Sequence, residues 1–127
     1  MSRSNAIPGQ VRLDDLIQVC RNGSEINEAL LLEMLSLFIG ENGRRVGLIQ
    51  DAARDLRQQD LRGALHALKG SAALVGADRL RHLAADMEED VVNGIGGDAV
   101  VASEELAREF AAVVATLRAL YPQLAST

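Results

Sequence analysis

The sequence predicts an all-α protein, an up-and-down antiparallel four-helix bundle with a short additional helix at its N-terminal end. Ala and Leu are the commonest residues and aromatic residues make up only 2% of the chain, a balance that favours helix over sheet. Both prolines, Pro8 and Pro122, stand near the ends, so none interrupts the long middle of the chain. In that middle, apolar residues recur every three or four positions, as one face of a helix requires.

Length and composition restrict the domain organisation and the class of partner. A chain of 127 residues suits one domain, with residues 1–10 expected as a flexible tail and residues 11–127 as the folded domain. The formal net charge of −5 argues against nucleic acid as the main partner, because phosphate backbones require a basic surface. The single cysteine, Cys20, excludes a disulfide within the chain and a multi-cysteine metal site, and we expect it in the core.

The sequence also lacks the signals of membrane or secreted proteins. No apolar run approaches the length of a membrane span, and the first residues lack the apolar stretch of a secretory signal. We therefore expect a cytoplasmic protein with no membrane partner. The start at Met1 and the plain ends favour a free-standing protein. Every long helix has a use within one bundle, so a monomer is the expected state.

The first two helices follow from apolar spacing and from residues that stop or start helices. Four residues at helical spacing predict a short first helix: Leu13, Leu16, Ile17 and Cys20. Asn22-Gly23 should end it, and Ser24 can cap a long helix from about Glu25 to Gln58. Seven residues form the expected inward stripe of that helix: Leu30, Met34, Leu37, Phe38, Leu48, Ala52 and Leu56. Three glycines outside the stripe are interpreted as tolerated surface residues, with a kink or a close-approach site as the alternative: Gly40, Gly43 and Gly47.

The remaining helices are bounded by similar signals. Asp60 is the expected cap of a third helix that runs to about Leu74, and Gly76 should end it. A fourth helix is predicted over Asp78 to Val92. The glycine loop at residues 93–97 has no following lysine, so it is not a nucleotide phosphate loop. Asp98 can cap a last helix, whose inward seam has six expected members: Leu106, Phe110, Val113, Leu117, Leu120 and Leu124.

The third helix places a histidine on a bare surface. Its inward stripe has five expected members: Leu61, Leu65, Leu68, Ala72 and Val75. His66 then faces water, with Lys69 and Gly70 beside it one turn later and Arg62 one turn earlier. Four residues around the imidazole are very small: Gly63, Ala67, Gly70 and Ala73. An exposed histidine on a helix normally has long polar neighbours, so this combination is unusual.

These residue types suit a phosphoryl carrier. A neutral imidazole is nucleophilic near pH 7, because its ordinary pKa is about 6.5. In-line attack on phosphorus requires a ring that stands clear of its helix, and Gly70 gives that clearance. Lys69, the chain's only lysine, can place a cation beside phosphoryl oxygens. The pattern alone leaves a second interpretation open, in which His66 and Lys69 are ordinary surface residues and Gly70 merely weakens the helix.

The segment Leu65–Ala77 resembles the signature of histidine phosphotransfer (HPt) domains. Its residues read Leu-His-Ala-Leu-Lys-Gly-Ser-Ala-Ala-Leu-Val-Gly-Ala, which is similar to the family pattern of a His, two residues, Lys-Gly-Ser and then Gly-Ala five residues after the Ser. The flanking helices agree over residues 13–92. The resemblance implies a four-helix bundle in which His66 is phosphorylated on the nitrogen far from the backbone. It also implies that Lys69 assists electrostatically and that Gly70 provides clearance.

The resemblance further implies a carrier that depends on its partners and is not an autonomous enzyme. The expected partners are response-regulator receiver domains and a hybrid sensor histidine kinase, and the receiver supplies an aspartate and magnesium. We expect no cofactor or metal in this chain, since His66 and His82 have no cluster of carboxylates. The expected docking face has six members beside His66: Arg62, Gly63, Ala67, Ala73, Arg79 and His82.

Two other functions remain as alternatives at the level of sequence. One is a helical adaptor of the same fold that binds receivers or a kinase without being phosphorylated; the intact His66, Lys69 and Gly70 argue against it. The other is a kinase fragment with ATP-binding parts, which no nucleotide motif supports.

Overall fold

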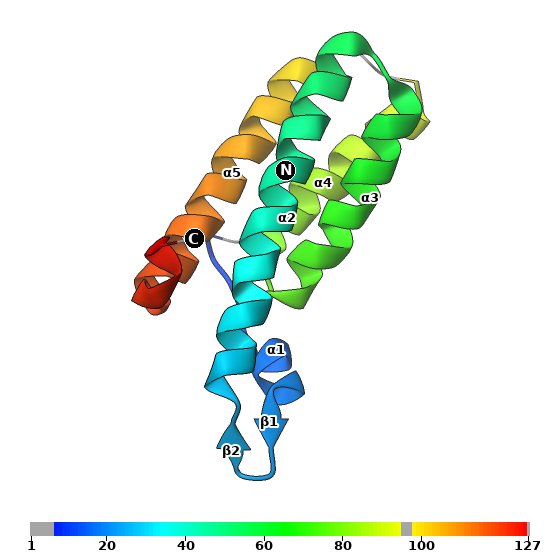
Figure 1. The fold of residues 1–127 in the computed structure, drawn as a ribbon. Coiled ribbons are helices and arrows are strands. Elements are labelled where there is room, and N and C mark those ends of the chain that lie inside the picture. The colour runs from blue at the N-terminus through cyan, green and yellow to red at the C-terminus, as the bar shows by residue number, and fades with distance from the viewer. Residues whose placement is uncertain (1–6, 95–97, 127) are drawn as a thin grey trace.

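The computed structural model describes residues 7–94 and 98–126, and within them it confirms the all-α bundle. Four long helices lie side by side, with the short elements of residues 14–26 at one end (Figure 1). The helices are α1 (Asp14–Val19), α2 (Glu28–Asp55), α3 (Gln58–Leu74), α4 (Asp78–Val92) and α5 (Ala99–Leu120), followed by a 3-10 helix, η1 (Pro122–Ser126). Helices α2 and α4 each pack against both α3 and α5, which gives the bundle its square cross-section.

The start of the long helix α2 differs from the prediction. A small antiparallel hairpin precedes it, formed by β1 (Arg21–Asn22) and β2 (Glu25–Ile26). Ser24 therefore lies in a turn and caps nothing. The cap is Asn27, whose side-chain oxygen accepts a hydrogen bond from the Leu30 amide at 3.0 Å, so α2 begins three residues later than expected.

The buried face of α2 was also predicted in part wrongly. Leu37, Leu48 and Leu56 are exposed, although apolar periodicity placed them inside. The buried row instead has eight members: Leu31, Leu35, Phe38, Asn42, Val46, Ile49, Ala52 and Ala53. Asn42 can occupy this row because its amide donates to the Phe38 carbonyl at 2.9 Å and its oxygen accepts from Arg45 at 2.9 Å.

The α2 glycines are tolerated surface residues, as the first interpretation held. A Cβ at Gly40 or Gly47 would meet nothing within 4 Å, and one at Gly43 would make only an ordinary contact with Phe110. None of the three is therefore a close-approach site, and the helix continues through all of them.

Helix α4 has the predicted bounds and α5 begins directly after Asp98 as predicted, whereas α3 begins earlier than predicted. Helix α3 begins at Gln58, so Asp60 lies in its first turn and pairs with Arg57 at 2.8 Å instead of capping it. Asp98 stands at the N-cap position of α5, but its side chain makes no capping hydrogen bond. Part of the predicted glycine loop, residues 95–97, lies outside the described residues. Leu120 is exposed at the end of α5, and Leu124 reaches the core from η1.

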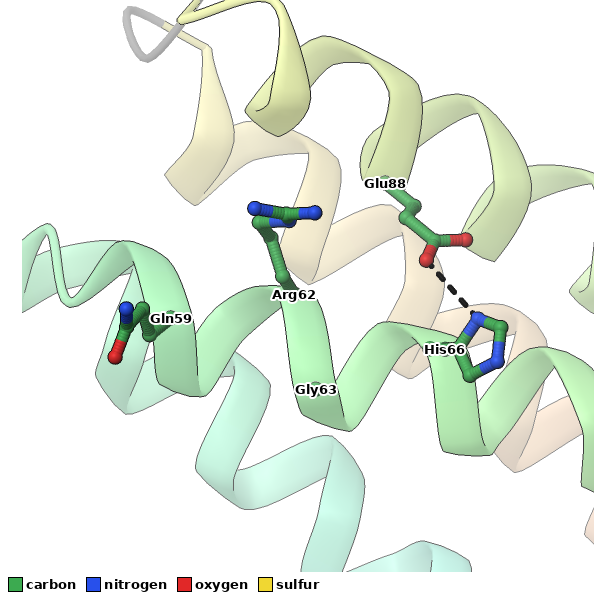
Figure 2. A pocket seen from close by; sticks show the side chains of 5 residues that line it. All are labelled: Gln59, Arg62, Gly63, His66 and Glu88. Carbon is green, nitrogen blue, oxygen red and sulfur yellow. Dashed lines mark hydrogen bonds and ion pairs between the residues drawn. The ribbon is translucent and has the colours of Figure 1, made fainter.

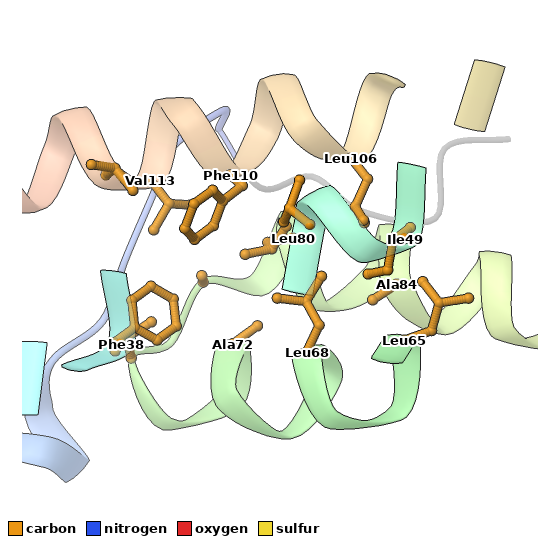
Figure 3. Packing of buried hydrophobic residues seen from close by; sticks show 14 of the residues in the cluster. Phe38, Ile49, Leu65, Leu68, Ala72, Leu80, Ala84, Leu106, Phe110 and Val113 are labelled. Atoms are coloured by element: carbon orange, nitrogen blue, oxygen red, sulfur yellow. The ribbon is translucent and has the colours of Figure 1, made fainter. Parts of the chain in front are cut away.

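A single core fills the space between the four long helices (Figure 3). Leu65, Leu68 and Ala72 of α3 are fully buried in it, opposite residues of α4 and α5. The rings of Phe38 and Phe110 join α2 to α5, with their centroids 6.1 Å apart. This burial fixes the rotation of α3 about its own axis, and so determines which residues α3 presents to solvent.

The N-terminal segment contacts the bundle through Gly9, Arg12 and Leu13, whereas residues 7, 8 and 10 are exposed. The amide of Gly9 donates to the buried carboxylate of Glu109 at 2.7 Å. The Arg12 guanidinium makes two hydrogen bonds to Asp78, at 2.8 and 3.1 Å, and the Arg12 amide donates to the Val75 carbonyl at 3.0 Å. This segment thus joins α5 to the turn between α3 and α4. Residues 1–6 of the predicted tail lie outside the described residues.

Candidate functional site

His66 stands on the outer face of α3, as the helical periodicity predicted. Its side chain is 74% exposed, whereas Leu65 and Leu68 on either side of it are fully buried. The imidazole is held outward because the apolar residues of α3 occupy the core and leave one face of the helix in water. His66 is therefore open to a partner from solvent.

A carboxylate on the next helix joins His66 to Lys69. The Glu88 side chain reaches from α4, and one of its oxygens lies 3.1 Å from Nδ1 of His66 (Figure 2). Its other oxygen accepts a hydrogen bond from the Lys69 ammonium at 2.7 Å. The carboxylate is only 19% exposed, so the pair is partly shielded from water. Glu88 thus holds the side chains of His66 and Lys69 near each other.

The charge state of Glu88 determines the tautomer of His66. The hydrogen bond and charge of Lys69, reinforced by His66, hold the pKa of the Glu88 carboxyl below its ordinary value, although partial burial opposes the shift. An ionised carboxylate can only accept hydrogen bonds, so Nδ1 of His66 must carry the proton that it donates. In the neutral ring the lone pair then lies on Nε2, the nitrogen far from the backbone. The arrangement leaves Nε2 free for nucleophilic attack.

Few side-chain atoms project from the helix surface around the imidazole, because several residues there are small. Gly63, Gly70 and Ala73 are exposed, and Ala67 is half-buried. A Cβ at Gly63 or Gly70 would meet nothing within 4 Å, so the fold itself does not require glycine there. Beside the ring lies an open hollow lined by five residues, three of them drawn with Glu88 and His66 in Figure 2: Gln59, Arg62 and Gly63. The small residues thus leave open space on the helix surface beside the imidazole.

Comparison with known families identifies the chain. The family described as "Hpt domain" matches residues 33–126, which covers α3, α4, α5 and most of α2. The chain belongs to the Hpt domain family. Hpt domains carry phosphoryl groups on histidine in two-component signalling, with kinases and receiver domains as partners. Neither the curated proteins nor the solved structures contain a match to this sequence.

Two residues that the sequence assigned to the docking face lie elsewhere in this Hpt domain. Arg79 turns toward α5, where its guanidinium lies 3.2 Å from Glu109. It is nine residues before Glu88, which places it on the opposite side of α4 from the His66 contact. His82 is half-buried with its Nδ1 covered, and its Nε2 lies 3.2 Å from the Arg81 guanidinium. The helical periodicity of α4 alone does not indicate which neighbouring helix each of its residues faces.

Glu88 contacts both His66 and Lys69, although the sequence pattern around His66 did not indicate it. His66 precedes the turn at Gly76 by ten residues, and Glu88 follows the same turn by twelve. In an antiparallel helical hairpin, residues at similar distances from the turn lie opposite each other. This register predicts that His66 and Glu88 face each other, which the spacing of residues along α3 alone does not indicate.

Two further features of the described residues concern metal binding and membrane spans. Among residues 7–94 and 98–126, no three His, Cys, Asp or Glu side chains are grouped so that they could hold a metal ion. None of the helices in that part of the chain is both long enough and apolar enough to span a bilayer.

Proposed function

We propose that this Hpt domain is a phosphoryl carrier in a phosphorelay and that Nε2 of His66 is the atom that carries the phosphoryl group. The exchange partners are aspartates of receiver domains, in a response regulator and in a hybrid sensor histidine kinase. The observation that carries the proposal is the exposed imidazole whose Nδ1 proton is donated to Glu88 at 3.1 Å. That contact directs the nucleophilic lone pair outward.

The transfer step follows from this tautomer. Nε2 attacks the phosphorus of an aspartyl phosphate, a bond from nitrogen to phosphorus forms, and the bond from phosphorus to the acyl oxygen breaks. The aspartate leaves as a carboxylate with the bonding electron pair. The ring becomes a phosphorylated imidazolium that keeps its Nδ1 proton, and the adjacent Glu88 carboxylate stabilises the positive charge. The reverse step passes the group to another receiver.

Lys69 and Gly70 support this step in different ways. Lys69 holds Glu88 in its ionised form and in place, through the 2.7 Å hydrogen bond. Gly70 leaves room for the receiver one turn after His66. By resemblance to the family, the receiver supplies the magnesium ion, which neutralises phosphoryl charge in the complex.

The proposed docking surface extends from His66 toward α2 and not toward Arg79 and His82. Leu74 lies on the exposed side of α3 two turns beyond His66 and is 43% exposed, and Leu37 of α2 is 54% exposed. Both line a surface cleft between α2 and α3, together with Met34 and Ser71. Exposed apolar residues grouped in this way are typical of interaction sites. A transient interface of about 600 Å² or less on each partner would cover this cleft and His66.

The test is phosphoryl exchange between the purified protein and a panel of phosphorylated receiver domains. We expect rapid uptake of acid-labile phosphate by the wild-type protein, none by His66→Gln, and normal uptake by the matched control His82→Gln. Uptake by His66→Gln would contradict the assignment of His66. Binding of receivers with no uptake by the wild-type protein would favour the adaptor function instead.

A further inference from the structure

The cation expected to contact the phosphoryl group is already engaged. The Lys69 ammonium lies 2.7 Å from Glu88, so these two charges largely neutralise each other. A phosphoryl group brings close to two negative charges to this surface near pH 7. If Lys69 moved onto the phosphoryl oxygens, its 2.7 Å hydrogen bond to Glu88 would break and the carboxylate would keep only the contact with His66. A second cation near the ring would offset phosphoryl charge that Lys69 leaves uncompensated while it is bound to Glu88.

Arg62 is placed to be that cation. It lies one turn before His66 on the same exposed side of α3 and lines the hollow beside the imidazole. Figure 2 shows its side chain on the side of α3 that faces Glu88, whereas the outer nitrogen of His66 points away from Glu88; Gly63 leaves the helix backbone bare between Arg62 and His66, so the guanidinium can turn toward the ring. Within the described part of the chain, no carboxylate pairs with Arg62. Four other arginines differ in this respect, since each has a carboxylate partner: Arg12, Arg54, Arg57 and Arg79.

We propose that Arg62 binds the oxygens of the phosphoryl group carried on Nε2 of His66. Side chains four residues apart on a helix have their Cβ atoms about 5–6 Å apart, a distance that an arginine spans. The planar guanidinium can donate two parallel hydrogen bonds to phosphoryl oxygens. This inference rests on the proposed function, because it needs His66 to be phosphorylated. The two cations of α3 then have different roles: Lys69 orients the Glu88 carboxylate, and Arg62 binds the phosphoryl group.

The test uses a phosphoryl donor with no protein surface. Phosphoramidate phosphorylates the free protein as its phosphorus–nitrogen bond breaks, ammonia leaves with the bonding pair, and the bond to Nε2 forms. Phosphorus NMR then follows the last ionisation of the phosphoryl group against pH. A nearby guanidinium favours the dianion, so we expect that pKa to rise by about 0.2 to 0.7 units in Arg62→Gln. Uptake from phosphoramidate should become about two- to fivefold slower.

Two further variants and one second assay separate the outcomes. In Arg62→Lys the pKa of the phosphoryl group should return part of the way to the wild-type value. Arg108→Gln makes the same charge change at an exposed position of α5 and should leave the wild-type titration unchanged. Coincident titration curves for wild type and Arg62→Gln would overturn the role of Arg62. So would slower transfer from a receiver with unchanged titration, since Arg62 would then contact the partner. Failure of the wild-type protein to accept phosphate from any receiver would instead contradict the proposed function.

Discussion

Glu88 accepts a hydrogen bond from Nδ1 of His66 at 3.1 Å, although the two residues belong to different helices. The contact exists because α3 and α4 form an antiparallel hairpin with its turn at Gly76. It assigns the ring proton to one nitrogen and the lone pair to the other. A residue of α4 thereby sets the chemistry of a residue of α3.

Replacing Glu88 should disturb the tautomer of His66. In Glu88→Gln the amide can either accept from Nδ1 or donate to it, so the two neutral tautomers should mix. We expect transfer from a phosphorylated receiver to slow about fivefold, equivalent to about 1 kcal/mol on the barrier. Nitrogen NMR of the ring would measure the tautomer, and quenched-flow assays would measure the transfer rate. An unchanged tautomer in this variant would exclude the orienting role of Glu88.

Lys69 should act through Glu88, so their effects should not add. Lys69→Gln leaves the carboxylate in place without its ammonium, and we expect slower transfer but not its loss. In a double-mutant cycle with Glu88→Gln, the rate effects should show a coupling of about 0.5–1 kcal/mol, because each variant breaks the same ion pair. Strict additivity would mean that Lys69 acts on the phosphoryl group independently of Glu88.

Replacing Gly70 should change stability and the transfer rate in opposite directions. Alanine at this exposed helix position meets no atom within 4 Å and has the higher helix propensity. Gly70→Ala should therefore raise the free energy of unfolding by up to about 1 kcal/mol, while the added methyl hinders the receiver and slows transfer. Urea unfolding and the transfer assay measure the two effects. Gly40→Ala, on α2, serves as a control that should be stabilised without a change in rate.

Gly76 should respond in the opposite way to Gly70. Its φ is +63°, and an added Cβ would overlap the backbone of Arg12. We expect Gly76→Ala to lower the free energy of unfolding by at least about 2 kcal/mol, from the strained φ and the overlap together. Thermal and urea unfolding would measure the loss. Stability equal to wild type would mean that the segment of residues 7–13 moves freely away from the turn.

Asp78 should make stability depend on pH. The hydrogen bonds and charge of Arg12 lower the pKa of the Asp78 carboxyl from its ordinary value of 3.8. A lowered folded-state pKa contributes stability that is fully present above the unfolded pKa and is lost as the pH falls through the folded value. Because Arg12 is largely exposed, we expect Asp78→Asn to cost less than about 1 kcal/mol at pH 7. The difference from wild type should shrink below about pH 4. Urea unfolding between pH 3 and pH 7 checks this; a constant difference would contradict it.

The sequence predicted the features that depend on one helix at a time. The exposure of His66, the inward row of α3 and the bounds of α4 each follow from periodicity and from turn residues. It failed where several leucines compete for one face, as on α2, where Asn42 is buried and Leu37 is not. It also failed where a role depends on which neighbour a helix face meets. Glu88 and Arg79 lie on opposite sides of α4, and only the packing of α4 against both α3 and α5 distinguishes them.

The separation of contacts along the chain has a consequence for the order of folding. His66, Lys69 and Glu88 belong to one hairpin of adjacent helices, whose closure costs little chain entropy. The hydrogen bond between Gly9 and Glu109 joins residues 100 positions apart, so it must wait until α5 has reached its place. We therefore expect the hairpin to assemble early and the N-terminal segment to dock late. The arrangement around the imidazole can thus be native before the two ends of the chain have met.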